Sequence, residues 1–234
     1  MALNSPYHSS PAVSENNLTS DLDVNPIEEL DPSVSGGYHV LFDREIPIEL
    51  RSQSAPSQAG AQEAIKVKVL LAPEGQSGLR IELTSESDLF FLYHHNLDEV
   101  SFRALQEQQR LMVELQEFPQ VILRQLNQVL KEPHSHLAVM FLASDGTARL
   151  DFIQSLEYKY VELLSLTFTA ATESVVRQCI TFRYNSLKSR LALTNNRLAE
   201  INSLIKVKNP SLLLQLQRSG PSALNQTRKS SQSK

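Results

Sequence analysis

One change of hydrophobic pattern, within residues 88–119, limits how this chain can fold. The segment begins with an apolar run at residues 89–93, which is typical of a β-strand covered on both faces. From Asp98 the apolar residues take helical spacing, and Asp98 or Ser101 can cap that helix. A second helix fits between Pro119 and Pro133. The segment therefore predicts a strand that leads directly into a helical hairpin.

Short alternating segments on both sides of this hairpin predict an antiparallel sheet. The turn between the fifth and sixth strands contains Asp145 and Gly146, a strong hairpin signal. The predicted strands are residues 38–50, 65–71, 79–84, 89–93, 137–142, 150–153 and 163–168. The predicted fold is mainly β with α: a seven-stranded antiparallel β-sandwich or half-barrel with an inserted helical hairpin and a C-terminal stalk helix.

The stalk is predicted from the pattern between Glu173 and about Lys206. Apolar residues recur there at alternating spacings of three and four, as at the a and d positions of heptads. Such a helix is about 50 Å long. Since the upstream elements pair among themselves, the stripe predicts a second copy of the chain as its partner; a helix that lies on its own domain is the alternative. The stripe consists of Ile180, Tyr184, Leu187, Leu191, Thr194, Leu198, Ile201 and Ile205.

The two ends of the chain differ in charge from the middle. Residues 1–37 carry six acidic and no basic residues, and residues 207–234 carry five basic and no acidic residues. Both segments are rich in Ser, Pro and Asn, which predicts disordered tails. A basic tail that contacts an acidic surface such as tubulin or nucleic acid is the alternative. The predicted domains are an acidic tail (1–37), a head domain (38–170), a stalk helix or short coiled coil (171–206) and a basic tail (207–234).

The sequence contains no recognisable set of residues for catalysis or for holding a metal or cofactor, which predicts a protein that is not an enzyme. Cys179 is the single cysteine, so an intramolecular disulfide and a cysteine zinc site are excluded. His94 and His95 are neighbours on a predicted strand and therefore point to opposite faces. No carboxylate completes a plausible metal set with His134 and His136.

Membrane and nucleic-acid partners are also disfavoured. No apolar run approaches the roughly 18 residues that a membrane-spanning helix needs. The N-terminus lacks the basic start and apolar core of a secretory signal. The helical hairpin at residues 98–132 carries six acidic and four basic residues. An element that faces phosphates should be basic, so a DNA-reading helix-turn-helix is rejected.

Several blocks, in the right order, resemble the N-terminal head of the spindle assembly abnormal protein six family, the centriolar cartwheel proteins. Residues 79–93 (LRIELTSESDLFFLY) resemble a strand pair that ends in the family's PFFLY-like block. Residues 102–119 resemble its DFxxLxxxQxLLVDFxxFP hairpin. Weaker matches are residues 40–42 with Pro47, residues 150–168 and residues 173–182. The resemblance covers about residues 38–200.

The resemblance implies a structural protein of the cytoplasm and cytoskeleton, at a centriole or basal body, flagellar base or apical complex. Family members dimerise through the stalk helix, and their heads join through an apolar residue on the loop between the last two strands. Tyr158 takes that inserting position, where the family usually has Phe, and Leu156 and Lys159 lie beside it. The implied stalk contacts are Ile180, Tyr184, Leu187, Leu191, Leu198, Ile201 and Ile205.

The implied partner is the chain itself, as a homodimer and higher oligomer, with other centriolar or microtubule-associated proteins as further partners. No small-molecule substrate, cofactor or membrane is implied. Since the heptads end near Lys206, the chain resembles short relatives that lack the long coiled coil; a truncated chain would have the same pattern. The pocket for Tyr158 is expected near the helical hairpin. By analogy of fold, a DNA-repair scaffold with a similar head and stalk is the alternative.

Overall fold

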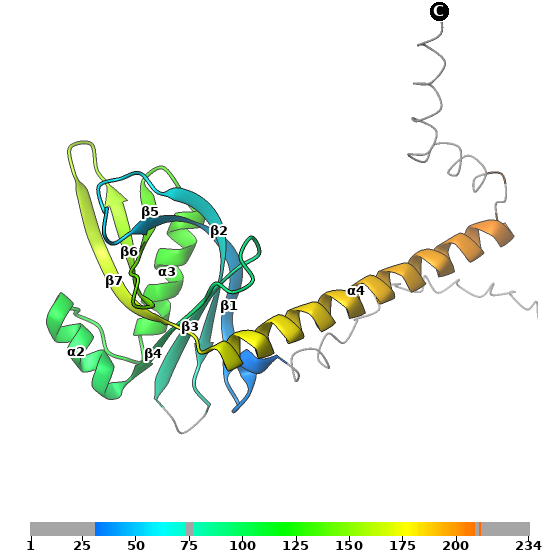
Figure 1. Cartoon of the computed structure of the whole chain (residues 1–234), viewed down its shortest axis with the longest axis horizontal. Coiled ribbons are helices and arrows are strands. Elements are labelled where there is room, and N and C mark those ends of the chain that lie inside the picture. Colours follow the sequence, from blue (N-terminus) through cyan, green and yellow to red (C-terminus); the bar gives the residue numbers. More distant parts are fainter. Residues whose placement is uncertain (1–30, 74–76, 209–210, 212–234) are drawn as a thin grey trace, which may run out of the picture.

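The computed structural model describes residues 31–73, 77–208 and 211. Within them, seven strands form a barrel, α2 and α3 pack on it, and α4 leaves it as a long stalk (Figure 1). The strands are β1 (His39–Ser52), β2 (Ala61–Leu71), β3 (Gly78–Ser85), β4 (Leu92–Asp98), β5 (His136–Leu142), β6 (Thr147–Ser155) and β7 (Tyr160–Ala170). The helices are η1 (Pro32–Val34), α2 (Glu99–Gln109), α3 (Phe118–Lys131) and α4 (Glu173–Lys208).

The sheet closes on itself in the order β1-β2-β3-β4-β7-β6-β5. All neighbouring strands are antiparallel except β1 and β5, which pair in parallel where Glu49–Ser52 meets residues 139–142. The predicted seven strands, inserted hairpin and stalk helix are confirmed. Closure through one parallel pair goes beyond the predicted half-barrel, and it leaves β1 and β5 without a free edge along that pair.

The fourth strand begins later than the sequence predicts. Residues 89–93 were expected to form a strand, but β4 starts at Leu92 and a turn precedes it. The Asp88 side chain accepts the Phe90 backbone N–H at 2.9 Å, a local bond that favours a turn over a strand. Leu89 and Phe90 are consequently 50% and 74% exposed, although the prediction buried them.

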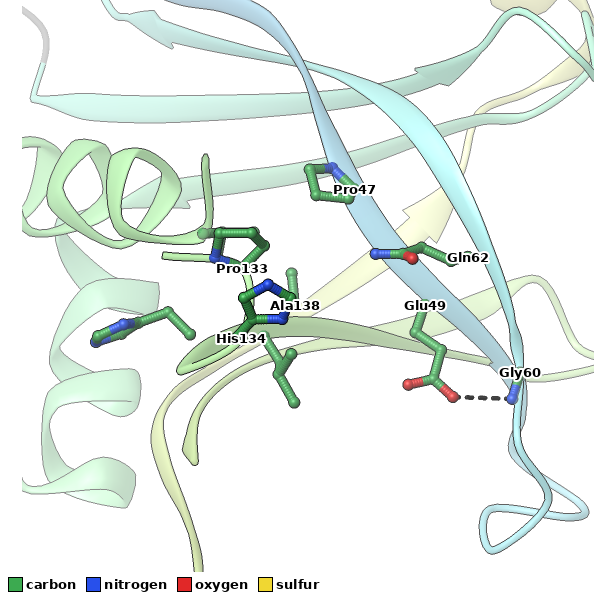
Figure 2. A pocket seen from close by; sticks show the side chains of 10 residues that line it. Pro47, Glu49, Gly60, Gln62, Pro133, His134 and Ala138 are labelled. Carbon is green, nitrogen blue, oxygen red and sulfur yellow. Dashed lines mark hydrogen bonds between the residues drawn. The ribbon is translucent and has the colours of Figure 1, made fainter. Parts of the chain in front are cut away.

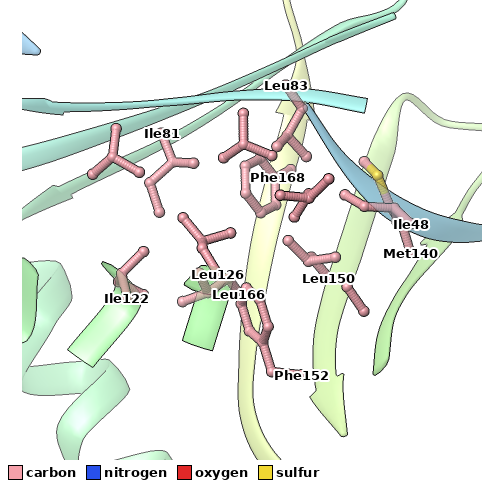
Figure 3. Packing of buried hydrophobic residues seen from close by; sticks show 14 of the residues in the cluster. Ile48, Ile81, Leu83, Ile122, Leu126, Met140, Leu150, Phe152, Leu166 and Phe168 are labelled. Atoms are coloured by element: carbon pink, nitrogen blue, oxygen red, sulfur yellow. The ribbon is translucent and has the colours of Figure 1, made fainter. Parts of the chain in front are cut away.

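The helical hairpin closes one side of the barrel core. Asp98 caps α2 as predicted, and Ser101 completes a reciprocal capping box by bonding back to the Asp98 backbone. In α3, a buried face with helical spacing comprises Phe118, Ile122, Leu126 and Val129. Figure 3 shows Ile122 and Leu126 beside strand residues such as Leu166 and Phe152. The hairpin therefore supplies part of the core.

Beyond a short backbone ladder between β4 and β7, side chains supply the hydrogen bonds to β7. The backbone pairs between these strands are limited to Tyr93 with Ala170 and His94 with Thr169. Farther along β7, the ring of His95 bonds to the Thr167 carbonyl at 2.7 Å. The Gln109 amide then bonds to both the carbonyl (2.5 Å) and the N–H (3.0 Å) of Ser165. These side chains satisfy backbone groups that no neighbouring strand reaches.

Replacing Gln109 by Ala is expected to lower the free energy of unfolding by about 1–2 kcal/mol, because it leaves two partly buried backbone groups without their partner. Urea unfolding followed by circular dichroism measures this change. Gln108→Ala is the matched control, since Gln108 is an exposed neighbour on the same helix. Equal losses in the two variants would show that Gln109 does not tie α2 to β7.

We expect His95 to make the stability of the head sensitive to pH. Burial lowers the pKa of its imidazole, only partly opposed by the bond to Thr167, and its Nε2 has no hydrogen-bond partner among the described residues. The unfolded chain therefore binds more protons than the folded chain below the ordinary pKa of about 6.5. We expect the free energy of unfolding to fall as the pH falls from there toward the lowered folded pKa. Urea titrations near neutral pH and near pH 5.5 should show a smaller loss in His95→Gln; an equal loss would contradict the assignment.

Part of the predicted acidic tail, before the predicted head boundary at residue 38, contacts the barrel. The last residues of the predicted acidic tail pack on the outer face of β2 and β3 through η1. Ser33 is buried and donates its hydroxyl to Glu82 at 2.5 Å, while Asp31 pairs with Lys68. Arg80 donates to the Ser33 carbonyl at 2.7 Å. The acid-rich composition concealed these specific polar partners; residues 1–30 and 212–234 of the predicted tails lie outside the described residues.

Candidate self-association surfaces

The loop between β6 and β7 presents Tyr158 to solvent. A backbone bond of 2.8 Å from the Leu156 N–H to the Lys159 carbonyl closes the turn. Tyr158 is 81% exposed, and the Lys159 ammonium lies 5.8 Å from the centre of its ring. Leu156 is 37% exposed. A tight turn that presents an exposed aromatic ring is a candidate interface anchor, because its backbone has little conformational entropy left to lose on binding.

A cleft of about 590 Å³ lies between the β1–β2 pair and the start of β5 (Figure 2). Its walls include Pro47 and Gln62 on the strands, Val129 and Pro133 around the end of α3, His134, and residues 136–138. The Tyr158 loop leaves the barrel beside this cleft. In the adjoining ladder His136 pairs with Gln154, and the Ser155 N–H donates to the Ser135 carbonyl at 2.7 Å. The exposed ring and the cleft thus lie at the same end of the head.

One wall of the cleft carries an ion pair between Glu49 and Arg51. Glu49 accepts bonds of 2.9 and 3.1 Å from the Arg51 guanidinium. It also accepts one of 2.9 Å from the Gly60 N–H (Figure 2). The Arg51 bonds are the main cause of a lowered pKa at Glu49, so this carboxylate stays ionised at neutral pH. The cleft therefore combines apolar walls with a strong hydrogen-bond acceptor, a chemistry that suits a phenol better than a phenyl ring.

Two features of this end of the head, Tyr160 and the cleft, were not predicted from the sequence. Tyr160 is 71% exposed and lies two residues after Tyr158, and the alternation of side chains along a strand could have identified it. The cleft itself had no signal in the sequence. Its residues come from segments about 70 residues apart, which only the parallel pairing of β1 with β5 brings together.

The second surface is the stripe along α4. The predicted helix is confirmed as one continuous element that extends away from the barrel (Figure 1). Ile180 and Ile205 are partly buried. The other predicted contacts are 53–65% exposed: Tyr184, Leu187, Leu191, Leu198 and Ile201. Leu193 and Leu204 are also exposed but lie outside the stripe. A helix that exposes so many large apolar side chains has an unpartnered face.

Basic residues flank the stripe. Between Glu173 and Glu200 the helix has no acidic residue. With Tyr184 and Leu191 at a positions, the flanking e and g positions include Arg183, Lys188, Arg190 and Arg197. The first turns of the helix are fixed to the head, since Arg183 donates to the Ser85 carbonyl at 3.0 Å.

The described residues reveal no metal centre: no group of three or more His, Cys, Asp or Glu side chains among them is arranged to hold an ion. Within the same residues, no helix has the length and apolar character needed to cross a membrane. Burial raises the pKa of the Cys179 thiol, which lies at the foot of α4 and is only partly exposed. The thiol is therefore protonated and poorly nucleophilic at neutral pH.

A closed barrel with an inserted helical hairpin and a single projecting helix defines a head-and-stalk class of protein. Residues 40–168 match the family model described as the Centriolar protein SAS N-terminal domain, SAS-6_N. This match covers more than half of the 234 residues, and the chain belongs to the SAS-6 family.

The similar curated proteins are much longer than the matched region. A Spindle assembly abnormal protein 6 homolog of Gallus gallus is 26% identical over 148 residues, which are 59% of this chain and 23% of the relative. The homolog of Danio rerio is 22% identical over 158 residues, which are 64% of this chain and 25% of the relative. The chain thus spans about a quarter of the length of these relatives, and the similarity concerns their head region.

Solved structures confirm the fold. An N-terminal fragment of Drosophila melanogaster Sas-6, dimerised via its coiled-coil domain, has a TM-score of 0.65 at 15% identity; 85% of this chain and 98% of the fragment are covered. A Leishmania SAS-6 fragment with parts of its coiled coil has a TM-score of 0.64 at 17% identity, with 75% and 99% covered. Both comparisons show a shared overall fold.

Proposed function

We propose that this chain is a self-assembling structural protein of the centriole or basal body, or of a related microtubule-based structure. The observation that carries the proposal is that one head-and-stalk chain of this family exposes two separate apolar surfaces. One surface is the Tyr158 loop with its neighbouring cleft, and the other is the stripe of α4. The centriolar family match and the homologs named spindle assembly abnormal protein 6 support the cellular setting.

The first contact joins two heads. A two-fold axis between them lets each Tyr158 enter the cleft of the other head, because loop and cleft are neighbours on one surface. Leu156 and Lys159 lie at the edge of this contact. The hydroxyl of Tyr158 would meet the Glu49 carboxylate as its acceptor, which accounts for Tyr where the family usually has Phe. The cleft reaches the end of α3, in keeping with the expected position beside the helical hairpin.

The second contact joins two stalks. Ile180, Tyr184, Leu187, Leu191, Leu198, Ile201 and Ile205 form the core of a parallel homodimer. The Drosophila fragment dimerised via its coiled-coil domain supports this mode of pairing. Two different two-fold contacts on one chain, when their axes do not coincide, generate rings or curved chains. Each contact can be weak, since the second one forms at high effective concentration.

Electron microscopy of the purified full chain tests the assembly. Rings or curved oligomers at high protein concentration are expected, and uniform single particles at all concentrations would contradict the proposal. Imaging of the tagged protein tests the location: a centriole, basal body, flagellar base or apical complex is expected. An exclusively nuclear signal would favour the DNA-repair scaffold instead. Other centriolar or microtubule-associated proteins are the expected partners.

A further inference from the structure

The loop between β3 and β4, residues 86–91, is a rigid and partly apolar projection beside the stalk. The Ser85 hydroxyl lies 2.8 Å from that of Ser87, which in turn donates to Glu63 at 2.9 Å. The Asp88 side chain and carbonyl accept the N–H groups of Phe90 and Phe91. This network holds Leu89 and Phe90 in solvent, at 50% and 74% exposure. An aromatic ring held there has the exposure and rigidity of a docking element.

The loop is also acidic, and the cation at its base is Arg183. Glu86 and Asp88 are exposed, and neither forms an ion pair within the described part of the chain. Its base is joined to the stalk, because the Arg183 guanidinium donates to the Ser85 carbonyl at 3.0 Å. Arg183 therefore marks where the loop lies along α4.

Heptad geometry shows which part of a second copy would reach this place. In a parallel pair of helices, a g position of one chain lies beside the following e position of its partner. Arg183 is at g and Lys188 is the following e position. The partner's Lys188 thus comes beside Arg183 and the loop. Without the loop, Arg183 and Lys188 would repel each other at this point.

We infer that the β3–β4 loop of each copy receives Lys188 of the other copy's stalk, with its ammonium between Glu86 and Asp88 and its aliphatic stem against Phe90. The inference rests on the proposed stalk dimer and adds a head contact to it. Charge complementarity supports it, because the acidic loop faces a stretch of α4 that contains only basic charges. Continuity with the stripe supports it as well: the loop touches the helix one residue before Tyr184, where the exposed stripe begins. The contact would fix how the two heads are oriented about the stalk.

The variant Lys188→Glu should change the dissociation constant of the stalk dimer in opposite directions, depending on whether the loop contact exists. All proteins are full-length and carry Tyr158→Glu, so that heads do not associate, and sedimentation equilibrium measures the dimer dissociation constant. A simple two-helix pair predicts tighter dimers for Lys188→Glu, because Arg183 gains an opposite charge. The loop contact predicts about tenfold weaker dimers. Glu86→Lys with Asp88→Lys should weaken dimers similarly, and combining these changes with Lys188→Glu should restore the affinity.

The apolar half of the contact has its own test. Phe90→Ser should weaken the dimer several-fold, whereas Met112→Ser should not, since Met112 is a 98% exposed apolar residue on the α2–α3 connection. In a Cys179→Ala background, chains with Phe90→Cys mixed with chains with Lys188→Cys should form a disulfide between them under mild oxidation. A chain that carries both cysteines is the comparison. If a disulfide forms only within that chain, and none forms between the mixed chains, the inference is wrong.

The outcomes separate the inference from the function on which it rests. If the Tyr158→Glu protein is a monomer at every concentration, the stalk dimer is wrong and the inference falls with it. If that protein dimerises while Lys188→Glu is equally tight or tighter, only the loop contact is wrong. Weakening by Lys188→Glu, restored by the loop reversals, supports both.

Discussion

Tyr158→Glu should leave the head folded and raise the dissociation constant of head-to-head association by about thirtyfold or more. The expected cost is at least about 2 kcal/mol, the usual loss when a central aromatic anchor is removed. The effect has two causes. The variant loses the apolar area of an 81% exposed ring, and it replaces a hydroxyl that can donate a hydrogen bond to Glu49 with a carboxylate that cannot.

Sedimentation velocity over a concentration series measures this effect, with the stalk contact removed by a second variant. Met112→Glu is the matched control, since it adds the same charge at a 98% exposed apolar residue far along the chain from the loop. Tyr158→Phe tests the hydroxyl separately from the ring. It should weaken association less than Tyr158→Glu does. The affinity that it loses should be smaller when Glu49 is changed to Gln. If Tyr158→Glu associates as tightly as the parent, the assignment of Tyr158 to the interface is wrong.

Glutamate at both Leu191 and Leu198 should abolish stalk dimerisation, with a rise of more than about a hundredfold in the dissociation constant. Both residues are at a positions and are 62% and 56% exposed in the single chain. In a parallel pair each would face its own copy, so the double variant buries four carboxylates where apolar contacts are expected. The barrel should keep its stability, because these residues lie beyond the last contacts of α4 with the head.

Sedimentation of this variant in the Tyr158→Glu background isolates the stalk from the head contact. Circular dichroism supplies an independent measurement, since the helix signal of the parent should rise with protein concentration while that of the variant should not. Ser189→Glu, at an exposed f position, serves as the control. A parent that is already monomeric, or a variant that dimerises equally well, would contradict the assignment of the stripe.

The sequence predicted the elements better than the way they join. Alternating residues located the strands, and Asp98 and Pro119 located the ends of the helices, because these signals are local. The parallel pairing of Glu49–Ser52 with residues 139–142 could not be predicted, since nothing in a single sequence records which remote strands become neighbours. The error at residues 89–93 has a local cause: the hydrogen bond from Phe90 to Asp88 outweighed the hydrophobicity of the run.

The candidate surfaces were also predictable from the sequence only where the signal is local. Spacing alone predicted the stalk stripe, and α4 exposes most of its large side chains. That a second copy covers them stays a prediction. The position of Tyr158 came from the resemblance to a family, and the structure adds that the residue is exposed. The bonds from Arg51 and Gly60 to Glu49 are local to the β1–β2 hairpin. The cleft was missed because α3 and the start of β5 reach these strands only when the barrel closes. No composition or motif reports such an arrangement.

The parallel pair of β1 and β5 has a consequence for synthesis and folding. Glu49 pairs with Val139, about 90 residues later, so β1 keeps an unpaired edge until the hairpin and β5 have been made. Closing so long a loop costs chain entropy before the pairing returns any free energy, which slows folding. The unfinished sheet would meanwhile expose a template for strands of other chains. We therefore expect a ribosome-bound fragment that ends at α3 to be the species most in need of a chaperone. Only chains that have closed the seam can present the cleft proposed for head association.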